Sequence, residues 1–151
     1  GQHKAIQLLR NHRLWEVFLS EHLGFAWDKV HDIAEQLEHV RSSELIARLG
    51  RFLGDPTIDP HGDPIPSHDL TIQPTGGTTF FAAKSGDSFT LVAAADNQDL
   101  LAKLNAAKVS LGSELVKVGK DKQGRQVMQV HGQSIAFSEV EAKQLHVSLS
   151  H

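Results

Sequence analysis

The sequence predicts an α+β protein in which a helical half precedes a strand-rich half. Two observations carry this prediction: the five prolines all lie between positions 56 and 74, and the hydrophobic periodicity changes across that segment. Before it, apolar residues recur at helical spacing. After it, short apolar runs are separated by glycine turns. We therefore expect a three-helix domain over residues 1–66 and a small β-barrel domain over residues 67–151.

The first helix should cover residues 2–22 and is apolar on two faces, because Leu14 and Val17 lie opposite the stripe that contains His12 and Glu16. A partner chain is the simplest cover for the second face, so we expect a homodimer formed by the first and third helices.

The second helix is expected over about 27–40, and the third should begin near Ser42 or Ser43. A serine is a good N-cap, and Glu44 suits the positive end of the helix dipole. The run Gly54-Asp55-Pro56 should end this third helix.

The second half reads as short strands with two helical segments. Gly124 and Gly132 are placed for hairpin turns, and Asp96 is the expected N-cap of the first helical segment. The expected strands cover 78–84, 88–95, 113–119, 125–131, 133–137 and 145–149, with helices at 97–107 and 138–143.

Composition excludes several classes of protein. The 151 residues include no cysteine, so disulfides and thiolate metal sites are absent from this sequence. No apolar run is long enough to cross a bilayer and no signal peptide opens the chain, so we expect no membrane partner and a cytoplasmic location. A net charge of -3 argues against a nucleic-acid surface, and no DNA-binding residue is predicted within this chain.

The most informative residues are His31, Glu35, Glu38 and His39. On a helix, their side chains would fall within an arc of roughly 100°. Two imidazoles and two carboxylates so close together repel one another unless a cation lies between them. The ten histidines of the chain also favour metal chemistry.

His12 and Glu16 form a second pair, at i,i+4 spacing on the preceding helix. A single pair of this kind is usually a solvated contact of little value. Here, however, the pair lies inside an apolar stripe, where an uncompensated carboxylate would cost several kcal/mol. The two groups together therefore predict a divalent-metal site.

Other residues have weaker claims to the metal. Asp96 and Asp99 could offer two oxygens from the second domain. His61 and His131 are expected to cap or hydrogen-bond their loops, and the remaining histidines to be exposed. A ligand set of carboxylate and imidazole without sulfur favours Mn²⁺ or Fe²⁺, although Zn²⁺, Co²⁺ or Ni²⁺ could bind more tightly in vitro.

Three runs of sequence contain candidate metal ligands: Arg10–Glu16, Lys29–Asp32 and Leu37–Val40. Together they resemble the metal-binding and dimerisation domain of the diphtheria toxin repressor family, the bacterial iron- and manganese-dependent transcriptional repressors. Pro60–Pro66 resembles the signature at the end of that domain. From about residue 70 the chain resembles, more loosely, the family's FeoA-like, SH3-like β-barrel.

This resemblance implies two metal sites. His12, Glu16 and His31 match the ancillary site, and Asp96 and Asp99 fall where some members add ligands from the barrel. Glu35, Glu38 and His39 match the primary regulatory site. Iron-type members carry cysteine at the position of Glu35 and manganese-type members carry glutamate, which implies a manganese or mixed preference here.

The resemblance also implies a function. The family begins with a winged helix-turn-helix that binds operator DNA, whereas this chain starts inside the connecting helix. We therefore expect the metal-sensing and dimerising portion of a repressor in manganese or iron homeostasis, with no catalytic residue. The alternative is a di-metal carboxylate enzyme of helical-bundle type, which needs Glu-x-x-His on each of two helices.

Overall fold

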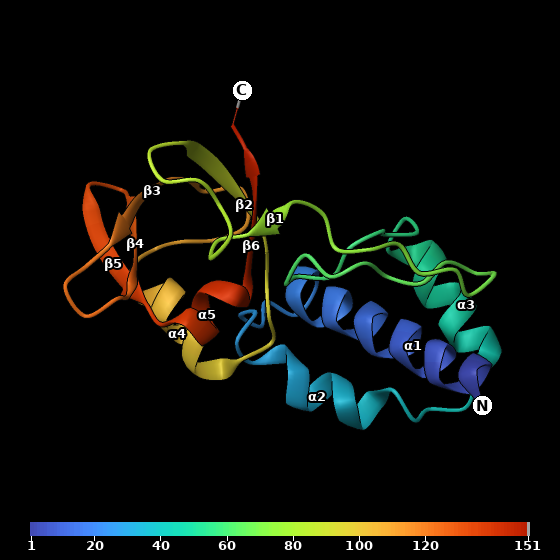
Figure 1. Cartoon of the computed structure of the whole chain (residues 1–151). Coiled ribbons are helices and arrows are strands. Elements are labelled where there is room, and N and C mark those ends of the chain that lie inside the picture. Colours follow the sequence, from blue (N-terminus) through green and yellow to red (C-terminus); the bar gives the residue numbers. More distant parts are fainter. Residues whose placement is uncertain (151) are drawn as a thin grey trace. The chain divides into compact units, whose positions relative to one another are not determined.

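The computed structural model describes residues 1–150, with helices and an antiparallel sheet (Figure 1). The chain divides into two compact units, Gly1–Pro74 and Thr75–His151. We call the first the helical unit and the second the sheet unit. Among the described residues, no helix is both long and apolar enough to cross a membrane.

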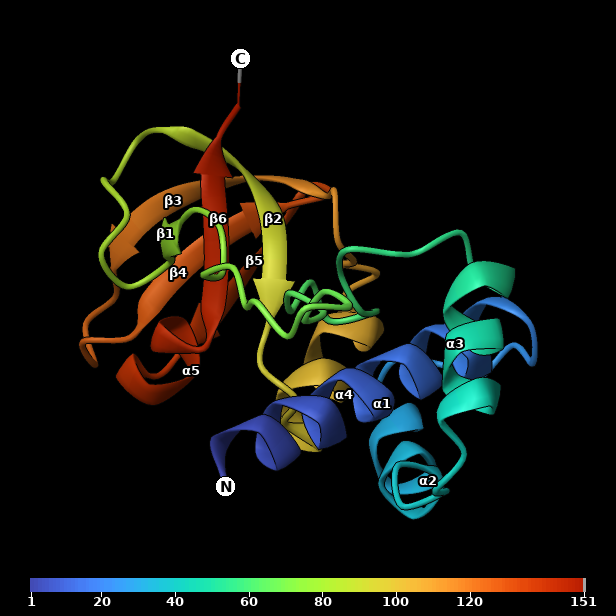
Figure 2. The same ribbon diagram turned by 90° about the vertical axis from the view of Figure 1, so that its right-hand side faces the viewer.

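The helical unit contains three helices, and α1 and α2 lie side by side in Figures 1 and 2. One apolar cluster joins Leu14 and Val17 of α1 to Ile46 and Leu49 of α3. A second cluster joins Leu19 of α1 to α2. The helices are α1 (Gln2–Glu21), α2 (Val30–Leu37) and α3 (Ser43–Phe52).

The predicted start of α3 is confirmed. Ser42 is its N-cap, and the hydroxyl of Ser42 accepts a hydrogen bond from the backbone N–H of Leu45 at 3.1 Å. Glu44 lies in the first turn, as expected from the helix dipole. Gly54 follows the helix with a φ of 78°, a conformation that glycine adopts at little cost.

Helix α2 is shorter than the predicted span of 27–40, and backbone carbonyls on both sides of it accept tertiary hydrogen bonds. Before it, the carbonyl of Trp27 accepts a bond from His61 Nε2 at 2.7 Å. After it, the carbonyl of Glu38 accepts a weaker bond from the Asn11 amide at 3.4 Å. A helix over 27–40 would have paired the Trp27 carbonyl with the N–H of His31, so the bond from His61 replaces an internal helix bond at the first end.

The proline-rich connector is held against α1 by two arginines. Arg10 donates to the carbonyl of Pro66 at 2.7 Å, and Arg13 donates to the carbonyl of Pro64. Within the connector, the Asp59 side chain accepts from the backbone N–H groups of His61 and Asp63, both at 2.9 Å. These bonds form a tight turn that presents Asp59 and His61 to α1.

The sheet unit is one curved antiparallel sheet of six strands, in the order β1-β6-β2-β3-β4-β5 (Figure 2). The hydrogen-bonded order ends at β1 and β5, so the predicted closure into a barrel is not confirmed. The strands are β1 (Thr78–Thr79), β2 (Ser88–Ala94), β3 (Glu114–Lys120), β4 (Gln126–Val130), β5 (Gln133–Phe137) and β6 (Leu145–Leu149).

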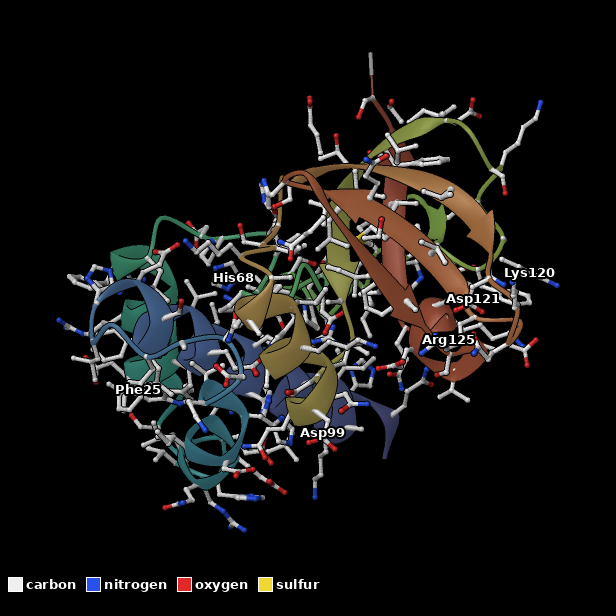
Figure 3. All side chains as sticks on the ribbon, turned by 90° about the vertical axis from the view of Figure 1, so that its left-hand side faces the viewer. Phe25, His68, Asp99, Lys120, Asp121 and Arg125 are labelled. Carbon is white, nitrogen blue, oxygen red and sulfur yellow. The ribbon has the colours of Figure 1, made fainter. Side chains whose placement is uncertain are left out.

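The predicted hairpin turns agree with the structure. Gly124 and Gly132 have φ values of 79° and 76°, and they lie in the β3–β4 and β4–β5 turns. At the first of these turns, labelled in Figure 3, Arg125 Nε donates to Asp121 Oδ2 at 2.8 Å.

Two details of the sheet unit differ from the prediction. The strand expected over 78–84 ends at Thr79, because the Lys117 ammonium binds the carbonyls of Phe80 and Phe81 at 2.9 and 2.7 Å. The N-cap of α4 (Gln98–Ala106) is Asn97 rather than Asp96, and its side chain accepts from the N–H groups of Asp99 and Leu100.

The helical segment predicted at 138–143 forms α5 (Glu139–Lys143). Ser138 caps it in a reciprocal arrangement, in which Ser138 Oγ accepts from the Glu141 N–H and the Glu141 side chain accepts from the Ser138 N–H.

Candidate metal centre

His12 and Glu16 face the interior of the helical unit, one turn apart on α1. Both residues are buried, and His12 Nε2 lies 3.4 Å from Glu16 Oε2. The i,i+4 spacing puts the two side chains on one face of the helix, so the sequence alone fixes this pair locally.

Glu38 orients the His12 ring. It follows the last turn of α2, and its Oε2 accepts a hydrogen bond from His12 Nδ1 at 2.6 Å. A proton held on Nδ1 leaves Nε2, the atom nearest Glu16, with the lone pair that a metal ligand needs. Burial opposes a charge on His12, but the contacts with Glu16 and Glu38 outweigh it and raise the pKa of His12.

His31 completes the group from α2. Its ring centroid lies 4.8 Å from that of His12. One ligand atom from each of His12, Glu16 and His31 can be chosen so that all lie within 4.8 Å of one another. The packing of α2 on α1 thus brings together three residues that the sequence analysis assigned to one site.

Glu16 shows why this group fits a cation. The carboxylate is 2% exposed, and Oε2 is a buried oxygen without a hydrogen-bond donor among the described residues. Burial raises the pKa of Glu16 to about 7, and the neighbouring Asp59 acts in the same direction while His12 opposes it. A bound divalent ion would satisfy this oxygen and stabilise the ionised carboxylate.

Asp59 and His61 also contact Glu16, and the sequence analysis did not place them there. His61 is fully buried, and its Nδ1 lies 3.5 Å from Glu16 Oε2 and 3.8 Å from Asp59 Oδ2. Burial opposes a charge on His61, but the contact with Asp59 and the negative charge of Glu16 outweigh it and raise the pKa of His61 to about 9.

The same contact acts in the opposite direction on Asp59. Burial disfavours its charge, but the contacts with His61 outweigh burial and lower the pKa of Asp59. These shifts favour a protonated His61 beside an ionised Asp59, with Glu16 next to both. The ligand atoms of these three residues also lie within 4.8 Å of one another.

His61 bonds the carbonyl of Trp27, outside its own loop, which the sequence analysis had not foreseen. A usable signal was present in the sequence. Two aspartates and a histidine lie within Asp59-Pro60-His61-Gly62-Asp63, where prolines and a glycine fix the backbone. Such a rigid turn can position a polar side chain against a distant helix.

The predicted arc of His31, Glu35, Glu38 and His39 is not kept, because α2 ends at Leu37. Glu35 lies near His31, with Oε2 to Nε2 at 3.7 Å; Glu35 is exposed and His31 is half-buried. His39 is 67% exposed and lies 3.5 Å from Glu38 Oε1. Among the described residues, Glu35, Glu38 and His39 do not converge on one point.

Asp96 and Asp99 belong to the sheet unit and are exposed. Asp99 lies in the first turn of α4, where it is labelled in Figure 3. Their predicted contribution to the metal site stays a prediction.

Residues 1–67 match a family model described as the metal-binding and dimerisation domain of iron-dependent repressors. Over 146 residues the chain is 32% identical to the diphtheria toxin repressor of Corynebacterium efficiens, covering 89% of this chain and 63% of that protein.

Solved structures extend the match over nearly the whole chain. One is a manganese-dependent transcriptional repressor in complex with manganese, 32% identical, with a TM-score of 0.89 and coverage of 99% of this chain and 72% of that one. The chain belongs to the diphtheria toxin repressor family. Another structure of the family, ScaR with bound Zn²⁺, is also 32% identical, with a TM-score of 0.88 and coverage of 97% of this chain and 74% of that one.

The chain spans less than two thirds of the length of the curated relatives that it matches first, and 63% of the Corynebacterium efficiens protein.

Proposed function

We propose that the helical unit is the metal-sensing and dimerising part of a metal-dependent transcriptional repressor. The observation that carries this proposal is the convergence of donor atoms from His12, Glu16 and His31 within 4.8 Å of one another. A buried carboxylate between two imidazoles is costly without a counter-charge, and a divalent cation supplies one. The names of the related repressors agree with this function.

The first site would be formed by His12 Nε2, Glu16 and His31, with Asp59 and His61 behind Glu16. Asp96 and Asp99 are proposed as further ligands from the sheet unit. Glu38 would then act on this site indirectly, through its hydrogen bond to His12 Nδ1.

The second, regulatory site would use Glu35, Glu38 and His39. To coordinate an ion there, the Glu38 carboxylate would have to share or leave its bond with His12. The two sites would therefore be coupled through one side chain. Three protein ligands leave open positions on a six-coordinate ion, which water or further protein groups would fill.

Mn²⁺ or Fe²⁺ is the proposed physiological ion. The donors are oxygen and imidazole nitrogen without sulfur, a set that suits these ions. The related structures contain manganese in one case and Zn²⁺ in another, which supports a site open to several divalent ions. The metal supplies positive charge and fixed coordination geometry.

A homodimer is proposed through α1 and α3. Phe18, His22 and Phe52 form an aromatic group at the C-terminal ends of these helices, with His22 and Phe52 rings 4.7 Å apart. Phe52 is 63% exposed, and Leu45 on α3 is also exposed. Apolar surface of this kind on a helix is typical of a protein interface.

In the whole regulator, we propose that a winged helix-turn-helix preceding these residues binds operator DNA. Metal binding would shift the population toward the arrangement of DNA-binding domains that fits the operator. The strong curvature of the sheet supports grouping the sheet unit with SH3-like, FeoA-like barrels (Figure 2). We propose a regulatory role and no catalysis, and no observation favours the di-metal enzyme.

Calorimetry with Mn²⁺ tests the first site. His31→Ala should remove one binding event, because it deletes one of the converging ligands. His3→Ala is the matched control, since His3 is exposed near the start of α1 and should leave binding unchanged. An unchanged stoichiometry for His31→Ala would show that the site is assigned wrongly.

A further inference from the structure

A cavity of about 660 Å³ lies at the N-terminal ends of α1 and α3, beside Glu38 and His39 of the proposed second metal site. Lys4, Arg10 and Arg41 line it, together with the serines that begin α3. Glu38 is the carboxylate among its described lining residues, and it already bonds His12. The cavity is therefore positive, although the whole chain carries a net charge of -3.

The burial of Arg10 is the strongest indication that the cavity binds an anion. The residue is 6% exposed, yet among the described residues its side chain makes one hydrogen bond, to the Pro66 carbonyl, and no ion pair. Burial lowers the pKa of Arg10 and the charge of nearby Asp55 opposes this effect, while Asp55 Oδ1 also lies 3.6 Å from His68 Nε2. A buried guanidinium with one hydrogen bond and no ion pair is costly, and it retains N–H donors for an anion.

The fold makes room for this guanidinium. A Cβ built on Gly50 would lie 3.1 Å from Arg10 Nη2, closer than most side-chain contacts. Arg10 is thus held in place by the Pro66 carbonyl on one side and by a glycine of α3 on the other. Such a fixed fork suits the oxygens of a phosphate.

The start of α3 supplies further donors. In this ten-residue helix, the Ser42 hydroxyl already accepts from the Leu45 N–H. The backbone N–H groups of Ser43 and Glu44 come earlier in the same first turn, where a helix attracts negative charge. Ser42 and Ser43 both line the cavity, so the helix end and Arg10 lie along the same cavity.

We propose that this cavity binds a phosphate monoester, with the phosphoryl oxygens at Arg10, Arg41 and the start of α3. Its volume lies in the range of small-molecule sites, roughly 300–1,000 Å³. Leu8, Val40 and Ile46 form an apolar part of the wall, which suits the organic group of the ester. The regulator would then respond to a second class of ligand besides the metal ion.

Amide NMR on the metal-stripped chain tests the proposal, with inorganic phosphate and phenyl phosphate as probes at constant ionic strength. We expect saturable shifts of the Ser43 and Glu44 amides, and tighter binding of phenyl phosphate than of inorganic phosphate. Shifts scattered over the surface, or none, would overturn the proposal. Equal binding of malonate would overturn the assignment to phosphate chemistry.

Variants separate this site from general electrostatic attraction. Arg41→Ala should weaken phenyl phosphate binding by roughly three- to tenfold, because it removes a charged hydrogen-bond donor. Arg51→Ala, within α3, changes the net charge equally but lies outside the cavity, so binding should stay within twofold. Equal weakening by both variants would contradict a specific site. Arg41 and Arg51 are exposed, so neither test depends on a disturbed core.

Discussion

The helical unit and the sheet unit bury different kinds of side chain. The sheet unit fills its interior with aromatic and aliphatic groups such as Phe80, Phe137 and Leu145. The helical unit also has apolar clusters, but it buries a set of charged and polar residues beside them: Arg10, Asn11, His12, Glu16, Asp59 and His61.

The apolar interior of the sheet unit serves stability, whereas the buried charged groups of the helical unit indicate a function. Apolar burial stabilises a fold directly, whereas buried charges cost free energy unless they are paired. In the sheet unit the ammonium of the buried Lys117 donates hydrogen bonds to the Phe80 and Phe81 carbonyls. In the helical unit Glu16 and Arg10 keep unused capacity, and each lies where a ligand of opposite charge is proposed.

The largest expected effect is in the sheet unit. Phe137 is fully buried, and its ring packs against Phe80 at 6.0 Å between centroids. Phe137→Ala should lower the free energy of unfolding of this unit by about 3–5 kcal/mol, as measured by amide exchange. Val118→Ala, at a position 54% exposed, is the control and should change it by less than about 0.5 kcal/mol. Similar losses for the two variants would contradict an apolar core centred on Phe137.

In the helical unit, a substitution at a buried polar residue is expected to stabilise the fold rather than to destabilise it. Glu16→Gln removes a charge that burial disfavours, so at pH 8 it should stabilise the metal-free protein on the order of 1–3 kcal/mol. The same variant should lose the stabilisation that Mn²⁺ gives to the wild-type protein.

Tryptophan fluorescence measures this unit specifically, because Trp15 and Trp27 both lie in it. The exposed Glu21→Gln on the same helix is the control. A destabilised metal-free Glu16→Gln would show that Glu16 serves the fold rather than the metal.

The two units should also respond to pH in opposite directions. His61, with its pKa raised from 6.5 to about 9, stabilises the folded helical unit fully below pH 6.5, and this stability is lost as pH rises through about 9. The pKa of Glu16 is raised from 4.5 to about 7, so the folded helical unit loses further stability as the pH rises from 4.5 to 7. Metal-free protein should therefore show a lower denaturation midpoint by tryptophan fluorescence at pH 9 than at pH 5.5.

Glu141 gives the sheet unit the reverse trend. Burial opposes its charge, but the Ser138 N–H and Lys103 outweigh burial and lower the pKa of Glu141. Its contribution is present above pH 4.5 and is lost as pH falls below that value. Amide exchange should show the sheet unit weakening from pH 5 to pH 3, with a smaller change in Glu141→Gln. A parallel decline of both units at high pH would refute the contrast.

The smallest expected effect concerns the proposed dimer. Phe52→Asp places a charge in the exposed aromatic group and should weaken dimerisation roughly tenfold in Kd, measured by analytical ultracentrifugation. Val140→Asp, on the exposed face of α5, should leave the dimer intact. A wild-type protein that stays monomeric at micromolar concentration would refute the interface.

The sequence predicted those elements that local patterns determine. The hydrophobic period and the serine cap identified α3, and the glycines identified the β3–β4 and β4–β5 turns. Helix spacing placed His12 beside Glu16 without any tertiary information. In each case, the interacting residues are at most four positions apart or lie in one turn.

Errors arose where distant groups compete for the backbone. His61 binds the carbonyl of Trp27 and Lys117 binds those of Phe80 and Phe81, so α2 and β1 are shorter than their patterns predicted. Likewise, Glu38 turns to His12 on another helix instead of joining Glu35. The hydrophobic pattern of a single segment cannot predict these contacts, because each joins residues far apart in the sequence.

An anomalous-scattering map of crystals grown with Mn²⁺ would show whether His12, Glu16 and His31 bind one ion. We predict a peak within about 2.5 Å of His12 Nε2, a Glu16 carboxylate oxygen and a His31 ring nitrogen. Manganese bound instead by His31, Asp32 and Glu35, or between Asp59 and His61 without His12, would show that this site is assigned wrongly.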